Sequence, residues 1–165
     1  DMQLICEAYH IMRDGLQLSQ DEMSRVFDDW NKSELDSFLI EITRDILKYK
    51  DEKGYLLERI RDAAGQKGTG KWTAIAAFEY AVPVTLIGES VFARCLSALQ
   101  KERIEASSIL KGPDTVYEGD KKKFLVHLRK ALYASKIISY AQGFMLLREA
   151  AKVYKWNLNY GGIAL

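Results

Sequence analysis

A helical pattern running from Lys122 to about Trp156 constrains the fold of this chain more than any other feature. Its apolar side chains recur mostly every three or four residues, as they do along one face of an α-helix. This stripe consists of Phe124, Leu128, Leu132, Ile137, Tyr140, Phe144, Leu147 and Ala151. The pattern predicts one helix of about nine turns. We interpret its aromatic members as core residues rather than as a cofactor site.

Shorter helical patterns fill the first part of the chain. The first runs from Asp1 to about Leu16, and a capping box at Ser19–Glu22 opens a second that extends through Trp30. A weaker capping box at Ser33–Asp36 predicts the start of a third helix, with Phe38 and Ile46 in its apolar stripe.

Two more helices are predicted in the middle of the chain. One runs from about Trp72 to Tyr80, and a long, largely apolar helix runs from Pro83 to about Ser108. A helix that is apolar on most sides belongs at the centre of a domain. No strand pattern of useful length is present, so the chain is predicted to be all-α, a bundle of long helices.

Composition excludes several classes of partner. The 165 residues are 48% apolar and 28% charged, with a net charge of +1, which gives no general field for nucleic acid or a membrane surface. No apolar run approaches the ~18 residues of a membrane helix. Cys6 and Cys95 are expected to be reduced core thiols of a cytoplasmic protein.

No metal site is expected. Glu7 and His10 have the Glu-x-x-His spacing of di-iron helix bundles, but such a site needs a second copy of the motif and two further glutamates. The only other histidine, His127, has Phe124 in the place of the glutamate.

The stretch Gly65–Thr73, Gly-Gln-Lys-Gly-Thr-Gly-Lys-Trp-Thr, predicts an anion-binding loop. Glycines allow a sharp turn and a close approach to a ligand, and the N–H groups at a helix start suit phosphate or carboxylate. A glycine-rich connector with its lysines in solvent is an open alternative. An ATP-binding loop is a weaker one, because Trp72 stands where a Ser or Thr would hold magnesium.

Arg94 is unusual because it lies in the apolar helix among small and apolar neighbours. A guanidinium in such surroundings is costly unless it is paired. One hypothesis is a structural ion pair with an acidic side chain. The other is an anion clamp, since the planar fork of arginine matches phosphate or carboxylate.

Several stretches together resemble 6-phosphogluconate dehydrogenases. They are Asp1–Leu4, Trp30–Asn31, Glu34–Thr43, Gly65–Thr73, Val84–Ser97, Ala131–Phe144 and Asn159–Ala164. The resemblance implies an NADP-dependent, metal-free oxidoreductase that acts as a homodimer. An enzyme of this family would convert 6-phosphogluconate to ribulose 5-phosphate and carbon dioxide in the pentose phosphate pathway. By matching motif positions, Lys67 and Arg94 would bind the substrate phosphate, with Thr69 beside them.

The resemblance also implies that residues 1–165 are a partial helical domain for substrate binding and dimerisation. Its NADP-binding Rossmann domain and catalytic lysine and glutamate would lie before Asp1. The C-terminal tail that completes the partner's phosphate site would follow Leu165. We therefore expect no catalytic or cofactor-binding residue, no bound NADP and no activity in this chain alone. The alternative is a stand-alone helical phosphate-binding or interaction module, which the mass of the native protein would distinguish.

Overall fold

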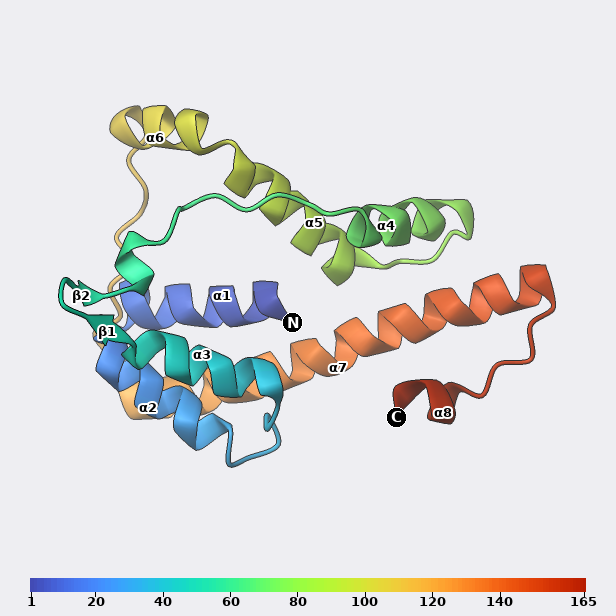
Figure 1. Ribbon diagram of the computed structural model, residues 1–165, viewed down its shortest axis with the longest axis horizontal. Coiled ribbons are helices and arrows are strands. Elements are labelled where there is room, and N and C mark those ends of the chain that lie inside the picture. Colours follow the sequence, from blue (N-terminus) through green and yellow to red (C-terminus); the bar gives the residue numbers. More distant parts are fainter. The chain divides into compact units, whose positions relative to one another are not determined.

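The computed structural model describes residues 1–165, and their regular secondary structure is helical apart from one short hairpin, which confirms the predicted all-α class (Figure 1). The chain divides into two compact units. Unit 1 comprises Asp1–Asp62 and Lys101–Lys136, and unit 2 comprises Ala63–Gln100 and Ile137–Leu165. Helix α7 (Lys121–Tyr154) contributes to both units. None of the helices combines the length and the apolar character needed to cross a membrane.

Unit 1 is a group of short helices packed with the first half of α7. Its elements are α1 (Met2–His10), a π-helical turn (Ile11–Gly15), α2 (Gln20–Trp30), α3 (Phe38–Lys48), the hairpin strands β1 (Lys50–Asp51) and β2 (Gly54–Tyr55), a 3-10 turn (Leu57–Arg59) and nearly all of α6 (Gln100–Ile109). Met12, Phe27 and Ile40 are fully buried at its centre, where Leu128 and Leu132 of α7 join them. The apolar stripe of the first half of α7 is therefore confirmed as core.

The helix starts of unit 1 follow from side-chain caps, one of which differs from the prediction. The Ser19–Glu22 capping box is present, with the Ser19 N–H donating to the Glu22 carboxylate over 2.8 Å. The predicted box at Ser33 is wrong, because the Ser33 hydroxyl donates to the Trp30 carbonyl over 2.6 Å at the end of α2. Ser37 caps α3 instead, so the helix begins at Phe38.

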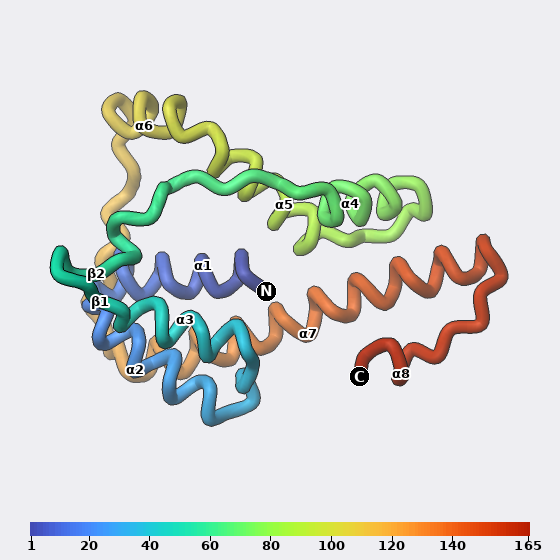
Figure 2. The backbone as a smooth tube through the Cα atoms, in the orientation of Figure 1, coloured from blue at the N-terminus to red at the C-terminus, as the bar shows by residue number.

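Unit 2 consists of α4 (Thr69–Glu79), α5 (Thr85–Ala98), the second half of α7 and α8 (Tyr160–Ala164). Its small core contains Ala77, Val82 and Val84, against which Ile87 and Met145 pack. Figure 2 shows how the backbone remains extended through residues 63–67 before it winds into α4. Helix α4 therefore begins three residues earlier than the predicted Trp72.

A buried glutamine of α7 fixes the start of α5. The Gln142 side-chain oxygen accepts the Leu86 N–H over 2.9 Å, and its nitrogen donates to the Thr85 hydroxyl over 2.9 Å. The first N–H groups of a helix have no partner within the helix, so Gln142 satisfies one of them from outside. This pair of bonds joins α5 to the second half of α7.

The predicted long helix from Pro83 to Ser108 is wrong, because the chain forms two helices there. Leu99, between α5 and α6, has a ψ of 51°, which is not helical. Beyond the break, Arg103 donates to the backbone carbonyl of Asp62 over 2.8 Å and to its carboxylate over 3.1 Å. A tertiary contact of this kind can override a helical preference, and neither Gly nor Pro lies near Leu99 to mark the break.

Several residues predicted in the core are exposed in this chain. Ile137 and Tyr140 of α7 are 53% and 61% exposed, and no residue of α5 is fully buried. Cys6 and Cys95 are free thiols, but both residues are exposed rather than part of the core. The predicted central position of the apolar helix is therefore not found within unit 2.

We predict that Gln142→Leu lowers the free energy of unfolding by about 2 kcal/mol, because it leaves the Leu86 N–H without its acceptor. Leucine and glutamine have similar helix propensities, so α7 itself should be unaffected. Urea denaturation would measure the change. The exposed Gln66→Leu is the control and should stay within about 0.5 kcal/mol of the parent chain. An equal loss in both variants would contradict the prediction.

Candidate functional site

The glycine-rich loop leads into a helix start that no side chain caps. Gly68 is the N-cap of α4 and has φ 118°, in the region that favours glycine. Its carbonyl accepts the Trp72 N–H over 2.9 Å and so begins the helical ladder. The N–H groups of Thr69, Gly70 and Lys71 precede that bond and have no acceptor within the helix. They form a cluster of free donors at the positive end of the helix dipole.

Two contacts hold the loop against α5. At its beginning, the Ala64 N–H donates to the Ser97 hydroxyl over 3.0 Å. At its end, Gly70 lies so close to Val91 that a Cβ on the glycine would be 2.6 Å from a Val91 methyl group. Arg94 lies midway between Val91 and Ser97, about 4.5 Å along the helix axis from each.

The structure therefore brings the predicted site residues into one region of unit 2. Lys67 and Thr69 belong to the loop between the two contacts, and Arg94 belongs to the part of α5 that the loop follows. The sequence did not single out Val91 or Ser97, because a valine and a serine in a helix are unremarkable. Their contacts with the glycine loop show that they hold it against α5.

Arg94 has unused hydrogen-bonding capacity. Its Nε is buried and has no hydrogen-bond partner within the chain. The ion pairs of unit 2 join Arg148 and Lys152 to Glu149, so Arg94 has no acidic partner there. The hypothesis of a structural ion pair thus finds no support within this chain. An anion from outside would satisfy a guanidinium in this position.

The loop residues are accessible to a ligand. Lys67 and Thr69 are exposed, and neither side chain forms an ion pair in the chain. The Thr69 carbonyl accepts the Thr73 hydroxyl over 2.9 Å, which stabilises the first turn of α4. No acidic residue occurs between Ala63 and Phe78. The local charge is therefore positive, as an anion site requires.

The ATP-binding alternative is not supported by the surroundings of the loop. A phosphate-binding loop of that class follows a buried strand and ends in a hydroxyl that holds magnesium. Here a 3-10 turn at Leu57–Arg59 and an irregular stretch precede the loop. Trp72, at the position of the hydroxyl residue, is exposed.

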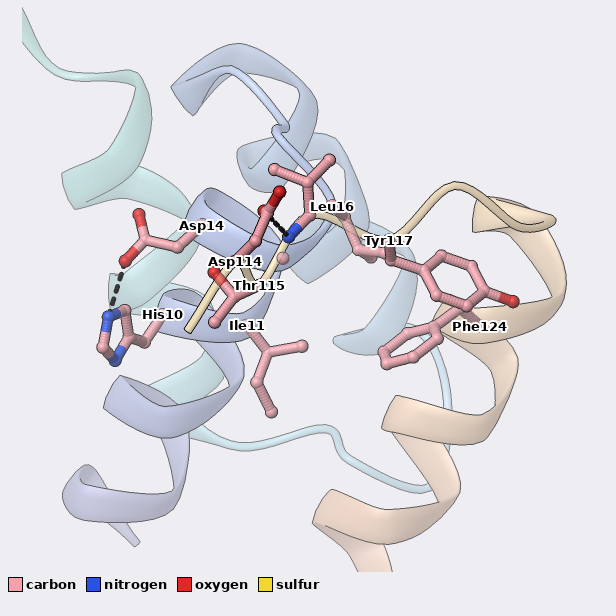
Figure 3. A pocket seen from close by; sticks show the side chains of 10 residues that line it. His10, Ile11, Asp14, Leu16, Asp114, Thr115, Tyr117 and Phe124 are labelled. Carbon is pink, nitrogen blue, oxygen red and sulfur yellow. Dashed lines mark hydrogen bonds and ion pairs between the residues drawn. The ribbon is translucent and has the colours of Figure 1, made fainter. Parts of the chain in front are cut away.

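A cavity of about 390 Å³ lies elsewhere, in unit 1 (Figure 3). Its charged groups already have partners. The Asp14 carboxylate pairs with His10 at 2.6 Å and accepts two bonds from Arg13, which lower the pKa of this carboxyl. Asp114 accepts the Val116 N–H over 3.1 Å. None of Lys67, Thr69 and Arg94 lines this cavity, so it is not the predicted anion site.

The His10 environment does not suggest a metal centre. The Glu7 carboxylate accepts a bond of 3.0 Å from Gln3, and His10 pairs with Asp14. The chain contains no group of three or more His, Cys, Asp or Glu side chains arranged to hold a metal ion.

Comparison with known proteins identifies close relatives. A family model described as the C-terminal domain of 6-phosphogluconate dehydrogenase matches residues 1–165. The decarboxylating 6-phosphogluconate dehydrogenase of Homo sapiens is 71% identical over the whole chain, which covers 35% of the human protein. The Drosophila melanogaster enzyme is 72% identical, with 34% of its length covered. The chain thus spans about a third of these curated relatives.

A solved structure shows the same fold. The Plasmodium falciparum 6-phosphogluconate dehydrogenase matches 99% of this chain with a TM-score of 0.93 and 41% sequence identity. The match covers 36% of the Plasmodium chain.

Proposed function

The chain belongs to the 6-phosphogluconate dehydrogenase family, and we propose that it forms the helical substrate-binding domain of such an enzyme. The Plasmodium relative is described in its apo form, in complex with its cofactor NADP+, and in complex with its substrate 6-phosphogluconate. We propose the same substrate and cofactor for the complete enzyme to which this domain belongs. Its products would be ribulose 5-phosphate and carbon dioxide, in the pentose phosphate pathway of the cytoplasm.

The observation that carries this proposal is the unpaired Arg94 beside the glycine loop. Its buried Nε lacks a partner, while the loop opposite offers backbone N–H donors at the start of α4. A phosphate between them would accept bonds from both sides. The planar guanidinium suits two phosphate oxygens at once, which a single ammonium group does not.

Lys67 and Thr69 have distinct roles in this site. The Lys67 ammonium would act as a mobile point charge on the loop, and the Thr69 hydroxyl would donate to a third phosphate oxygen. The phosphate of 6-phosphogluconate is remote from the carbons that react. Its binding energy would therefore serve to hold the sugar in position for the reaction rather than to stabilise developing charge.

The residues of this chain do not fit a nicotinamide dinucleotide. Such a cofactor binds at the switch point of a parallel sheet, on a Gly-x-Gly-x-x-Gly turn between a strand and a helix. The strands of this chain are the two-residue, antiparallel β1 and β2. We propose that NADP is bound by a Rossmann domain outside residues 1–165, and we assign it no step here.

We predict that the purified chain neither reduces NADP in the presence of 6-phosphogluconate nor binds NADP measurably. The stretch 63–78 around the site contains no carboxylate or imidazole that could act as general acid or base. NADPH fluorescence would follow turnover, and calorimetric titration would follow binding. A complete 6-phosphogluconate dehydrogenase is the positive control. Steady NADPH production by the chain alone would refute the prediction.

We also propose that the domain is part of a homodimer, and we predict that the chain self-associates. Helices α4 and α5 carry large exposed apolar side chains, including Phe78 at 85% and Phe92 at 65% exposure. Apolar patches of this kind favour association. Multi-angle light scattering at micromolar concentrations should give the mass of a dimer or a larger species. A monomer across the whole concentration range would count against the proposal.

For the site itself, we predict that Arg94→Lys in the complete enzyme raises the Michaelis constant for 6-phosphogluconate by about tenfold to a hundredfold. Lysine keeps the charge but loses the paired N–H donors, each worth about 1.5–3 kcal/mol. The turnover number should change much less, because the phosphate does not react. Steady-state kinetics would measure both constants.

The control is Arg25→Lys, an exposed arginine of α2 in unit 1, which should leave both kinetic constants unchanged. A structural role for Arg94 predicts a different result, namely a lower melting temperature with a normal Michaelis constant. That result would remove the phosphate role from Arg94.

A further inference from the structure

We infer that Gly70 is a positioning residue, whose missing side chain sets the distance between the glycine loop and Arg94. The inference rests on the proposed function of this site. It assigns a role to the contact between Gly70 and Val91. Both residues lie next to the proposed anion site, but neither provides a side chain that binds the anion.

The contact is too close for any other residue. A Cβ at Gly70 would lie 2.6 Å from Val91 Cγ2, whereas ordinary van der Waals contact begins near 3.4 Å. The Val91 Cβ would be 4.0 Å away, so the conflict is with one methyl group. That methyl group belongs to a β-branched side chain in a helix, which strongly prefers a single rotamer. Rotation of Val91 is therefore an unfavourable way to make room.

Backbone conformation does not explain the glycine. The glycines of this chain with positive φ are Gly54 and Gly68, and Gly70 is not among them. Gly70 lies within the first turn of α4, where alanine would favour the helix by about 1 kcal/mol. The close approach to α5 is thus the feature that requires glycine at this position.

A side chain at Gly70 would act directly on the site. To restore ordinary contact, the start of α4 must move about 0.8 Å from α5, the difference between 3.4 and 2.6 Å. Thr69 precedes Gly70 in the chain, and Arg94 follows Val91 by one turn of α5. The movement would therefore draw the loop donors away from the guanidinium. A displacement of about 1 Å in a binding group can cost up to a hundredfold.

The test is a mutant cycle in the complete enzyme. We expect Gly70→Ala to raise the Michaelis constant for 6-phosphogluconate about tenfold while the turnover number changes less than about threefold. Val91→Ala is the matched control, because it removes the conflicting methyl groups and keeps the glycine. Because Val91 also packs against the loop, the Michaelis constant of Val91→Ala is the reference value against which the double variant is compared. The double variant Gly70→Ala with Val91→Ala should recover most of the lost affinity.

A second readout needs folded protein but no turnover. Saturating 6-phosphogluconate should raise the melting temperature of Gly70→Ala less than that of the parent enzyme, and the double variant should recover the shift. This comparison remains informative if Gly70→Ala lowers the stability of the enzyme.

The outcomes separate this inference from the proposed function. If Gly70→Ala binds the substrate normally while Arg94→Lys binds it weakly, the positioning role is wrong and the phosphate site stands. A double variant as weak as Gly70→Ala would also overturn the positioning role. If Arg94→Lys and Gly70→Ala both bind 6-phosphogluconate normally, the proposed phosphate site and the positioning role are both wrong.

Discussion

The side-chain amide of Gln142 is the interaction on which the arrangement of unit 2 depends. It accepts the Leu86 N–H and donates to Thr85, so the first turn of α5 is held to α7 by two hydrogen bonds. Farther along α5, Val91 and Ser97 hold the glycine loop at its two ends. The contacts at Val91 and Ser97 therefore place the loop along the part of α5 that carries Arg94, and Gln142 fixes that helix to α7.

Arg94 lowers the stability of the domain because its guanidinium has no acidic partner. A half-buried guanidinium is less well solvated than one in water, and its buried Nε lacks an acceptor in this chain. A carboxylate from the domain would satisfy it but would compete with a bound anion for the same donors. Leaving Arg94 free keeps those donors available in a fixed position. In the site that we propose, this arrangement trades some stability of the domain for preorganised donors.

The sequence revealed the unusual members of the site but not their supports. The glycine loop and Arg94 could be recognised because each departs from what its local surroundings favour. Val91, Ser97 and Gln142 are ordinary helix residues, and their importance lies in contacts with distant parts of the chain. Such contacts leave no pattern in a single sequence. For the same reason, the break at Leu99 could not be predicted, since no Gly or Pro marks it.

Several apolar residues of α5 and α7 that were predicted to be buried are exposed, and there is a physical reason for this difference. A helix that is apolar on most sides is suited to the interior of a protein. In this chain, however, Phe92 and Leu96 of α5 are 65% and 58% exposed, and Ile137 and Tyr140 of α7 are similarly open. Their sequence is suited to surroundings that unit 2 by itself does not supply. In the homodimer that we propose, a second subunit would supply such surroundings. The same reasoning applies to Arg94, because a polar group without a partner and an apolar face without cover both indicate contacts beyond unit 2.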